Sequence, residues 1–146
     1  MITDAIIAPI ELRTLKITDV HFKLFEKPLE NTKLNLGIKY KTSGPEDDGT
    51  GGAYALRAFL KLSASLASSE DKTDVRLESG ADVFAEVAID SSYFETADAA
   101  RDYLAKNALS MSYAHSRSVL MTIAGMTPAG DFTLPPIIPD AIKLQE

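Results

Sequence analysis

The stretch SYAHSRSVLMTIAGMTPA, Ser112–Ala129, is followed almost at once by DFTLPPIIP, Asp131–Pro139. The first part has the small and apolar residues of a packed helix, and it predicts a helix end at Gly125 because Pro128 cannot continue one. The second part is apolar and rich in proline. Neither part carries a catalytic motif, so this end of the chain predicts a surface that binds other chains.

The composition is that of an ordinary globular domain. The chain has 146 residues, 45% hydrophobic and 25% charged, which predicts a single domain over residues 1–146. The net charge of −6 argues against binding to nucleic acid or to an anionic membrane. The absence of Cys excludes disulfides and thiolate sites. Without a signal peptide or a membrane-length apolar run, we expect a cytoplasmic protein.

Alternating apolar and polar residues predict strands in the first half of the chain. LNLGIKY, residues 34–40, is joined by the polar turn 43–52 to the longer alternating run 54–67, which predicts an antiparallel hairpin. VRLESGADVFAEVAI, residues 75–89, is a third strand. LKITDVHFKLF, residues 15–25, is a fourth, in which the apolar phase changes; a bulge near residues 18 and 19 explains the change.

The second half of the chain predicts helix. A capping box, SYFE, favours a start at Ser92, and Thr96 followed by Asp98 is an equally good start. The alanine-rich run 95–109 and the piece 112–125 consist largely of helix formers. Four strands followed by helix predict an α+β fold with a four-stranded antiparallel sheet.

No residue pattern supports an enzyme, a metal or a cofactor. His21 and His115 lie far apart in the sequence, and neither has metal-ligand spacing. The turn GPEDDGTGG, residues 44–52, lacks the Lys-Ser/Thr pair of a phosphate loop and precedes a strand. None of the serines lies in a nucleophile motif. We therefore expect a non-enzymatic protein.

Two features of the strands predict partner surfaces. One is an acidic row with strand spacing, which we interpret as a solvated, partner-facing surface: Glu78, Asp82, Glu86 and Asp90. The other is Phe59 with Phe84, each on the polar phase of its strand. Aromatic residues on a water-facing sheet predict a binding surface. The alternative is a sheet covered on both faces within one chain.

The order of these features resembles the bacterial export chaperone SecB and its SecB-like relatives, over roughly residues 12–139. The resemblance implies one SecB-like domain with an N-terminal arm at 1–11 and a short C-terminal tail at 137–146. The family has a Tyr-Ala-Arg helix start, a helix ending at Gly, a Pro, and a Leu-x-Leu-x-Pro run. The matching residues here are Tyr113, Ala114, Gly125, Pro128, Phe132, Leu134 and Pro136. The sequence departs from the family in two places: the Arg is either replaced by His115 or displaced to Arg117, and the Phe before the Pro is Thr127.

The resemblance implies a long helix in the C-terminal half, assembly as a dimer of dimers, and ATP-independent holding of unfolded chains in apolar grooves. It places the following residues in the client groove, although the first four could equally be ordinary core: Leu34, Leu36, Ile38, Tyr40, Phe59, Phe84, Phe132 and Leu134. The small-residue helix face would pack against a second copy through Ser112, Tyr113, Ser116, Val119, Leu120 and Ile123.

The resemblance leaves several partners open. The export motor ATPase is one candidate, although the sequence has no Cys for the zinc-binding tail that docks it in the family. A SecB-like chaperone dedicated to an antitoxin is a second possibility. An oligomeric structural or adaptor module with the same fold, and without chaperone activity, is a third.

Overall fold

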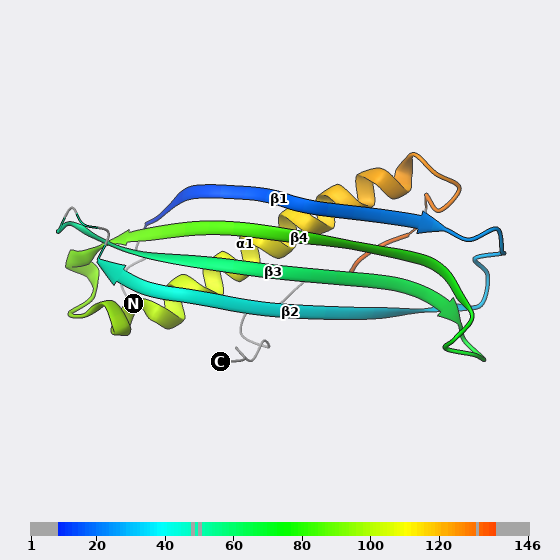
Figure 1. Cartoon of the computed structure of the whole chain (residues 1–146), viewed down its shortest axis with the longest axis horizontal. Helices are drawn as coiled ribbons and strands as arrows, with labels where there is room; N and C mark the ends of the chain where they lie inside the picture. The colour runs from blue at the N-terminus through cyan, green and yellow to red at the C-terminus, as the bar shows by residue number, and fades with distance from the viewer. Residues whose placement is uncertain (1–8, 48, 50, 131, 137–146) are drawn as a thin grey trace, which may run out of the picture.

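Four long strands are followed by one long helix in a computed structural model that describes residues 9–47, 49, 51–130 and 132–136 (Figure 1). The elements are β1 (Ile10–Leu24), β2 (Thr32–Asp47), β3 (Ala53–Ser68), β4 (Val75–Asp90), the short 3-10 helix η1 (Ser91–Tyr93) and α1 (Ala97–Gly125). The predicted tail and residues 1–8 of the predicted arm lie outside the described residues, and residues 10 and 11 of the arm belong to β1.

The strands form one antiparallel sheet in the order β1-β4-β3-β2. Short turns join β2 to β3 and β3 to β4, whereas β1 and β2 lie at opposite edges. Residues 25–31 therefore cross the whole end of the sheet, as Figure 1 shows. The predicted α+β fold, with its four-stranded antiparallel sheet and its long helix, is confirmed.

The first strand contains two irregularities in its pairing with β4. The register shifts between Leu12 and Thr14, and again between Ile17 and Asp19. The second shift confirms the predicted bulge near residues 18 and 19. An extra residue returns the following apolar side chains to the face they would otherwise leave. The first shift was not predicted.

The helix starts at the second of the two predicted positions. Thr96 is the N-cap, and its hydroxyl accepts a hydrogen bond from the Ala99 amide at 3.1 Å. The start at Ser92 was wrong, because Asp90 accepts from the Ser92 amide at 2.9 Å and caps η1 instead. The two predicted helical pieces are a single helix of 29 residues that ends at Gly125, as expected.

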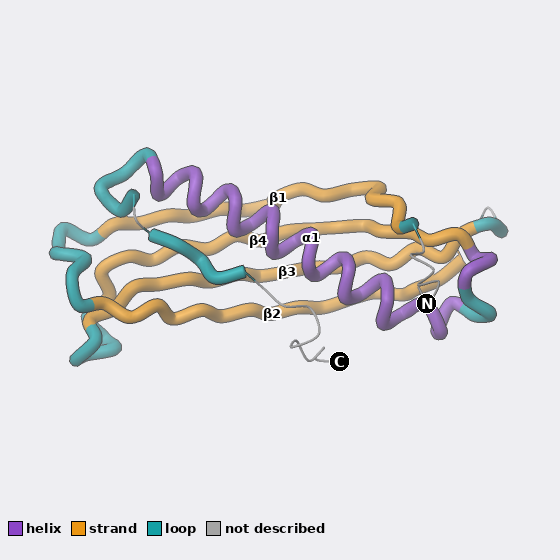
Figure 2. The backbone as a smooth tube through the Cα atoms, turned by 180° about the vertical axis from the view of Figure 1, so that it is seen from behind, coloured by secondary structure: helices purple, strands orange, loops and turns teal. Residues whose placement is uncertain are grey.

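The helix crosses one face of the sheet diagonally (Figure 2). We call this the inner face and the opposite one the outer face. The core lies between the inner face and α1 and includes Leu56, Leu60, Leu62, Leu77, Val83, Val87, Leu104, Leu109, Tyr113 and Leu120. Burial of this apolar surface stabilises the two-layer arrangement at about 25 cal/mol per Å².

Candidate functional site

A cavity of about 930 Å³ lies where β1 ends, β2 begins and the chain leaves α1. We call it the end cavity. Its walls are residues 24–30, which include the loop from β1 to β2, then Thr32, Leu34 and Leu66 of the sheet, and Pro128, Ala129, Phe132 and Thr133 after the helix. Three segments far apart in the sequence therefore meet around it.

The end cavity has an apolar interior and a charged rim. Leu34, Leu66 and Phe132 belong to the hydrophobic core or pack against it, while Glu26 and Glu30 are exposed. Small-molecule and peptide pockets of about 300–1,000 Å³ have this mixture of apolar lining and few polar groups. The site suits an apolar or aromatic side chain whose neighbours stay in water.

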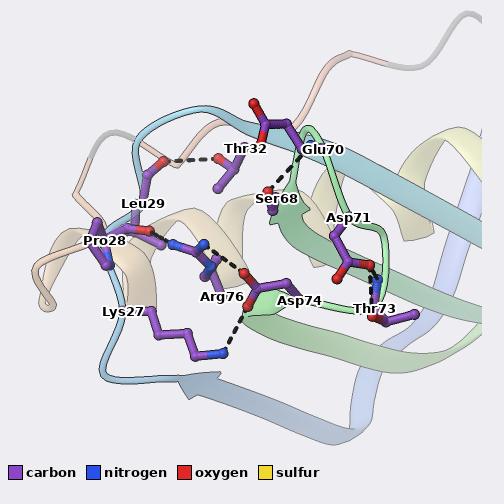
Figure 3. Close-up of polar contacts among 10 residues, drawn as sticks. All are labelled: Lys27, Pro28, Leu29, Thr32, Ser68, Glu70, Asp71, Thr73, Asp74 and Arg76. Atoms are coloured by element: carbon purple, nitrogen blue, oxygen red, sulfur yellow. Dashed lines mark hydrogen bonds and ion pairs between the residues drawn. The ribbon is translucent and has the colours of Figure 1, made fainter.

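A polar cluster holds the part of the cavity wall formed by the loop from β1 to β2. Figure 3 shows the contacts of this cluster. Arg76 at the start of β4 donates to the carbonyl of Pro28 at 2.6 Å and to Asp74 at 2.7 Å. Lys27 donates to the other Asp74 oxygen at 2.8 Å. The loop from β1 to β2 is therefore tied to the turn between β3 and β4.

The electrostatics of this cluster favour the ionised carboxylate. The hydrogen bond from Arg76, and then that from Lys27, lower the pKa of Asp74 from its ordinary value of 3.8 to about 2. The Arg76 Nε is buried and has no hydrogen-bond partner among the described residues.

The turn and the loop are each stiffened from within. Asp71 accepts from the amide and the hydroxyl of Thr73, at 3.0 and 2.7 Å, and these bonds lower the pKa of Asp71 (Figure 3). At the other side, the Thr32 hydroxyl donates to the Leu29 carbonyl at 2.9 Å, and Asn31 turns the chain with φ of 55°. The cavity wall is preorganised rather than loose.

The inner wall of the end cavity is held against α1. The Tyr113 hydroxyl donates to the carbonyl of Pro135, and Arg117 Nε donates to the Leu134 carbonyl at 2.7 Å. The Phe132 ring meets Phe22 of β1 edge-on, with centroids 6.3 Å apart. Residues 132–136, the described part of the proline-rich segment, therefore lie along the helix that precedes them (Figure 2).

The predicted client residues of β2 lie on the inner face. Leu34, Ile38 and Tyr40 are partly buried against the core, and Leu36 is 38% exposed. The Tyr40 hydroxyl donates to the Ala105 carbonyl of α1 at 2.6 Å, and burial raises the pKa of Tyr40. Of these four, Leu34 lines the end cavity.

The remaining predicted client residues do not form one groove within the chain. Phe59 and Phe84 lie on the outer face, with ring centroids 5.1 Å apart. Phe132 lines the end cavity but is only 6% exposed, and Leu134 is fully buried. The Phe132 ring is buried because it closes the core beneath the loop from β1 to β2.

The predicted oligomer interface is largely buried within the chain itself. Ser112, Tyr113, Ser116 and Leu120 are at most 1% exposed, and Val119 and Ile123 are half-buried. The small side chains were expected to pack against a helix of a second copy, but they are buried inside their own chain. Assigning this stripe to an interface between copies was therefore wrong for its four buried members.

The predicted acidic row is divided. Glu78, Asp82 and Glu86 lie on the outer face, where Glu86 accepts from Arg57 at 3.1 Å. Asp90, the last residue of β4, shares their phase, and its carboxylate accepts from the Ser92 amide and caps η1. Among the described residues, no group of three His, Cys, Asp or Glu side chains is arranged to hold a metal. In the same part of the chain, no helix has the length and apolarity to cross a membrane.

Sequence reasoning missed the loop from β1 to β2 as a wall of the site. The signal was present in FEKPLEN, residues 25–31, where Phe25 and Leu29 flank a proline between two strands. An apolar pair in a connecting loop is unusual, because loops are mostly solvated. Arg76 gave no sequence signal for this role, since the Pro28 carbonyl that it binds is 48 residues away along the chain.

Comparison with known proteins identifies the fold. Neither a family model nor a curated protein matches the sequence. The structure is similar to a SecB-like chaperone of Mycobacterium tuberculosis solved in complex with a peptide from the antitoxin HigA1. The TM-score is 0.55 at 14% identity, over 94% of this chain and 91% of the other. The predicted SecB-like fold is confirmed.

Proposed function

We propose that this protein is an ATP-independent chaperone, a holdase that binds unfolded or precursor polypeptides at the end cavity. The observation that carries the proposal is the cavity itself, about 930 Å³ and bounded by Leu34, Leu66 and Phe132. Support comes from its setting in the fold of a SecB-like chaperone that binds an antitoxin peptide.

The chemistry of the end cavity favours unfolded chains as ligands. An unfolded polypeptide exposes apolar side chains that a folded one buries, and each gains about 25 cal/mol per Å² on entering an apolar cavity. Binding by burial requires no nucleotide. The charged rim at Glu26, Lys27 and Glu30 leaves the flanking client residues in water.

Self-association belongs to the same proposal, at a different place from the predicted stripe. Leu12 and Val20 are 44% and 41% exposed although they lie opposite the buried Val87 and Ala81 of β4. They therefore belong to the inner face, at an edge that the diagonal helix leaves uncovered. We expect a second copy to cover this edge, giving a dimer or a dimer of dimers.

The proposal is tested by light scattering from an aggregating, chemically denatured client. A charge in the end cavity, Leu34→Asp, should weaken client binding by about tenfold, which is about 1.4 kcal/mol. The matched control is Asn35→Asp, which introduces the same charge one residue away on the opposite face of β2. Equal suppression of aggregation by both variants, with both folded by circular dichroism, would place client binding elsewhere.

The nature of the client is a finer part of the proposal. An antitoxin segment is one candidate, suggested by the peptide in the similar structure, and a cytoplasmic export precursor handed to a motor ATPase is another. Titration with each type of peptide separates them. The competing function, a structural or adaptor module, predicts an oligomer that leaves client aggregation unchanged at every ratio.

A further inference from the structure

The outer face of the sheet carries an exposed aromatic pair on its two central strands. Phe59 of β3 is 47% exposed, and its ring lies 5.1 Å from that of Phe84 on β4, measured between centroids. Cross-strand aromatic pairs stabilise sheets, which accounts for their contact. It does not account for the half of Phe59 that stays in water.

Lysines surround the exposed side of Phe59. Lys39 and Lys41 of β2 and Lys61 of β3 line a hollow of about 440 Å³ beside its ring, which we call the outer hollow. Asp82 and Thr18 close its far side. In addition, the Lys16 ammonium lies over the Phe84 ring, 6.0 Å from its centroid. An apolar centre is thus bordered mainly by cations.

Protection of the sheet edge explains only part of this arrangement. Lysines on an edge strand discourage pairing with other chains, and β2 is an edge strand, so Lys39 and Lys41 fit that role. Lys61 and Phe59 lie on β3, inside the sheet, where no edge needs protection. Their exposure calls for another explanation.

The lysines of the outer hollow are exposed and carry their charge into solvent. Lys39, Lys41 and Lys61 form no ion pair with any other described residue; even Asp82, which is opposite Lys61 in the register, forms none with it. The whole chain carries a net charge of −6, so this cationic hollow runs against its overall charge. Unpaired cations around an exposed ring complement an anionic, aromatic ligand.

We propose that the outer hollow is a docking site for an acidic polypeptide segment that carries an aromatic side chain. The aromatic side chain stacks on Phe59, and carboxylates on either side of it pair with Lys39, Lys41 and Lys61. The site is separate from the end cavity, since it lies on the opposite face of the sheet. It therefore binds a second partner or a second part of one chain.

An acidic peptide fits this face better than a nucleic acid. Glu78, Asp82 and Glu86 run along β4 beside the aromatic pair and would repel a continuous phosphate backbone. A peptide places its carboxylates only where its sequence does, so it can meet the lysines of β2 and β3 and avoid the acidic row. Single-stranded RNA, which also stacks on aromatic rings, is the competing occupant in the test.

The test uses fluorescence anisotropy of a labelled seven-residue peptide, Gly-Glu-Glu-Phe-Glu-Glu-Gly. We expect the double variant Lys39→Glu with Lys61→Glu to weaken its binding by about tenfold, and Phe59→Ser by about fivefold. Raising salt from about 50 mM to about 500 mM should weaken binding to the natural protein. The same peptide with Lys in place of Glu should bind at least tenfold more weakly, by about the same electrostatic effect.

The matched control is Lys33→Glu, on the same edge strand but about 20 Å from Lys39, which should leave binding unchanged. Because all these residues are exposed, the variants should fold, and circular dichroism verifies it. Equal binding of the Glu and Lys peptides, or equal losses with Lys33→Glu, would overturn the proposal. Tighter binding of a labelled oligouridine than of the acidic peptide would overturn it in favour of RNA.

Discussion

The two faces of the sheet are formed by the same strands, but the inner face is covered by α1 and the outer face is exposed to solvent. On the inner face, Leu60 is 2% exposed under α1; on the outer face its neighbour Phe59 is 47% exposed. Strand side chains alternate between faces, so one residue separates a core position from a surface position. Hydrophobicity alone therefore does not assign a role in this protein, whereas the face to which a side chain points does.

The largest expected effect compares two phenylalanines on these faces. Phe132→Ala, on the inner side, should lower the free energy of unfolding by about 3–5 kcal/mol because it leaves a cavity in the core. Phe59→Ala, on the outer face, should cost at most about 1 kcal/mol, since it loses only part of one ring contact. Urea denaturation of both variants measures the difference. Similar midpoints would mean that Phe132 is not core.

A smaller effect concerns the hydrogen bond that attaches residues 132–136 to α1, on the inner side of the sheet. Tyr113→Phe removes the hydrogen bond to the Pro135 carbonyl and should lower the free energy of unfolding by about 1 kcal/mol. Client affinity should fall with it, because this bond anchors the segment that begins with Phe132 and Thr133, which line the end cavity. The control is Tyr93→Phe, at a 42% exposed position. Equal changes in stability and client affinity for both variants would mean that the Tyr113 hydroxyl does not hold this segment.

The third prediction concerns acid stability at the end cavity. The lowered pKa of Asp74 stabilises the fold fully above its ordinary value of 3.8, and this contribution is lost as the pH falls toward about 2. Asp74→Asn should be less stable than the natural protein at neutral pH and should match it at the acid end. Urea midpoints measured across this window test the sign. A constant difference would assign the effect to packing instead of charge.

The smallest expected effect concerns Ser112, on the inner side of α1. Its hydroxyl is fully buried and has no hydrogen-bond partner among the described residues. Ser112→Ala should leave stability unchanged or raise it by up to about 1 kcal/mol, because an unsatisfied polar group is removed. Ser116→Ala is the control, since that hydroxyl donates to the Ser112 carbonyl at 2.8 Å. Thermal melts compare the two, and destabilisation by Ser112→Ala alone would contradict the assignment.

The sequence by itself determined the elements and their order. Period-two alternation identified β2, β3 and β4, the phase change located the bulge in β1, and Gly125 with Pro128 located the end of α1. These are local signals, because side-chain alternation and backbone conformation depend on residues within a few positions. The face of Phe59 and Phe84 was predicted for the same reason.

Only the tertiary structure decided which helix stripe is buried and where the end cavity lies. From the sequence, the stripe through Ser112 and Ser116 could pack equally well against a helix of a second copy or inside its own chain. In the structure it is buried inside its own chain. The end cavity brings residues 24–30 together with Phe132 and Thr133, and Arg76 of β4 holds the Pro28 carbonyl in its wall. Contacts between segments this far apart depend on the complete fold, so no local pattern in the sequence encodes them.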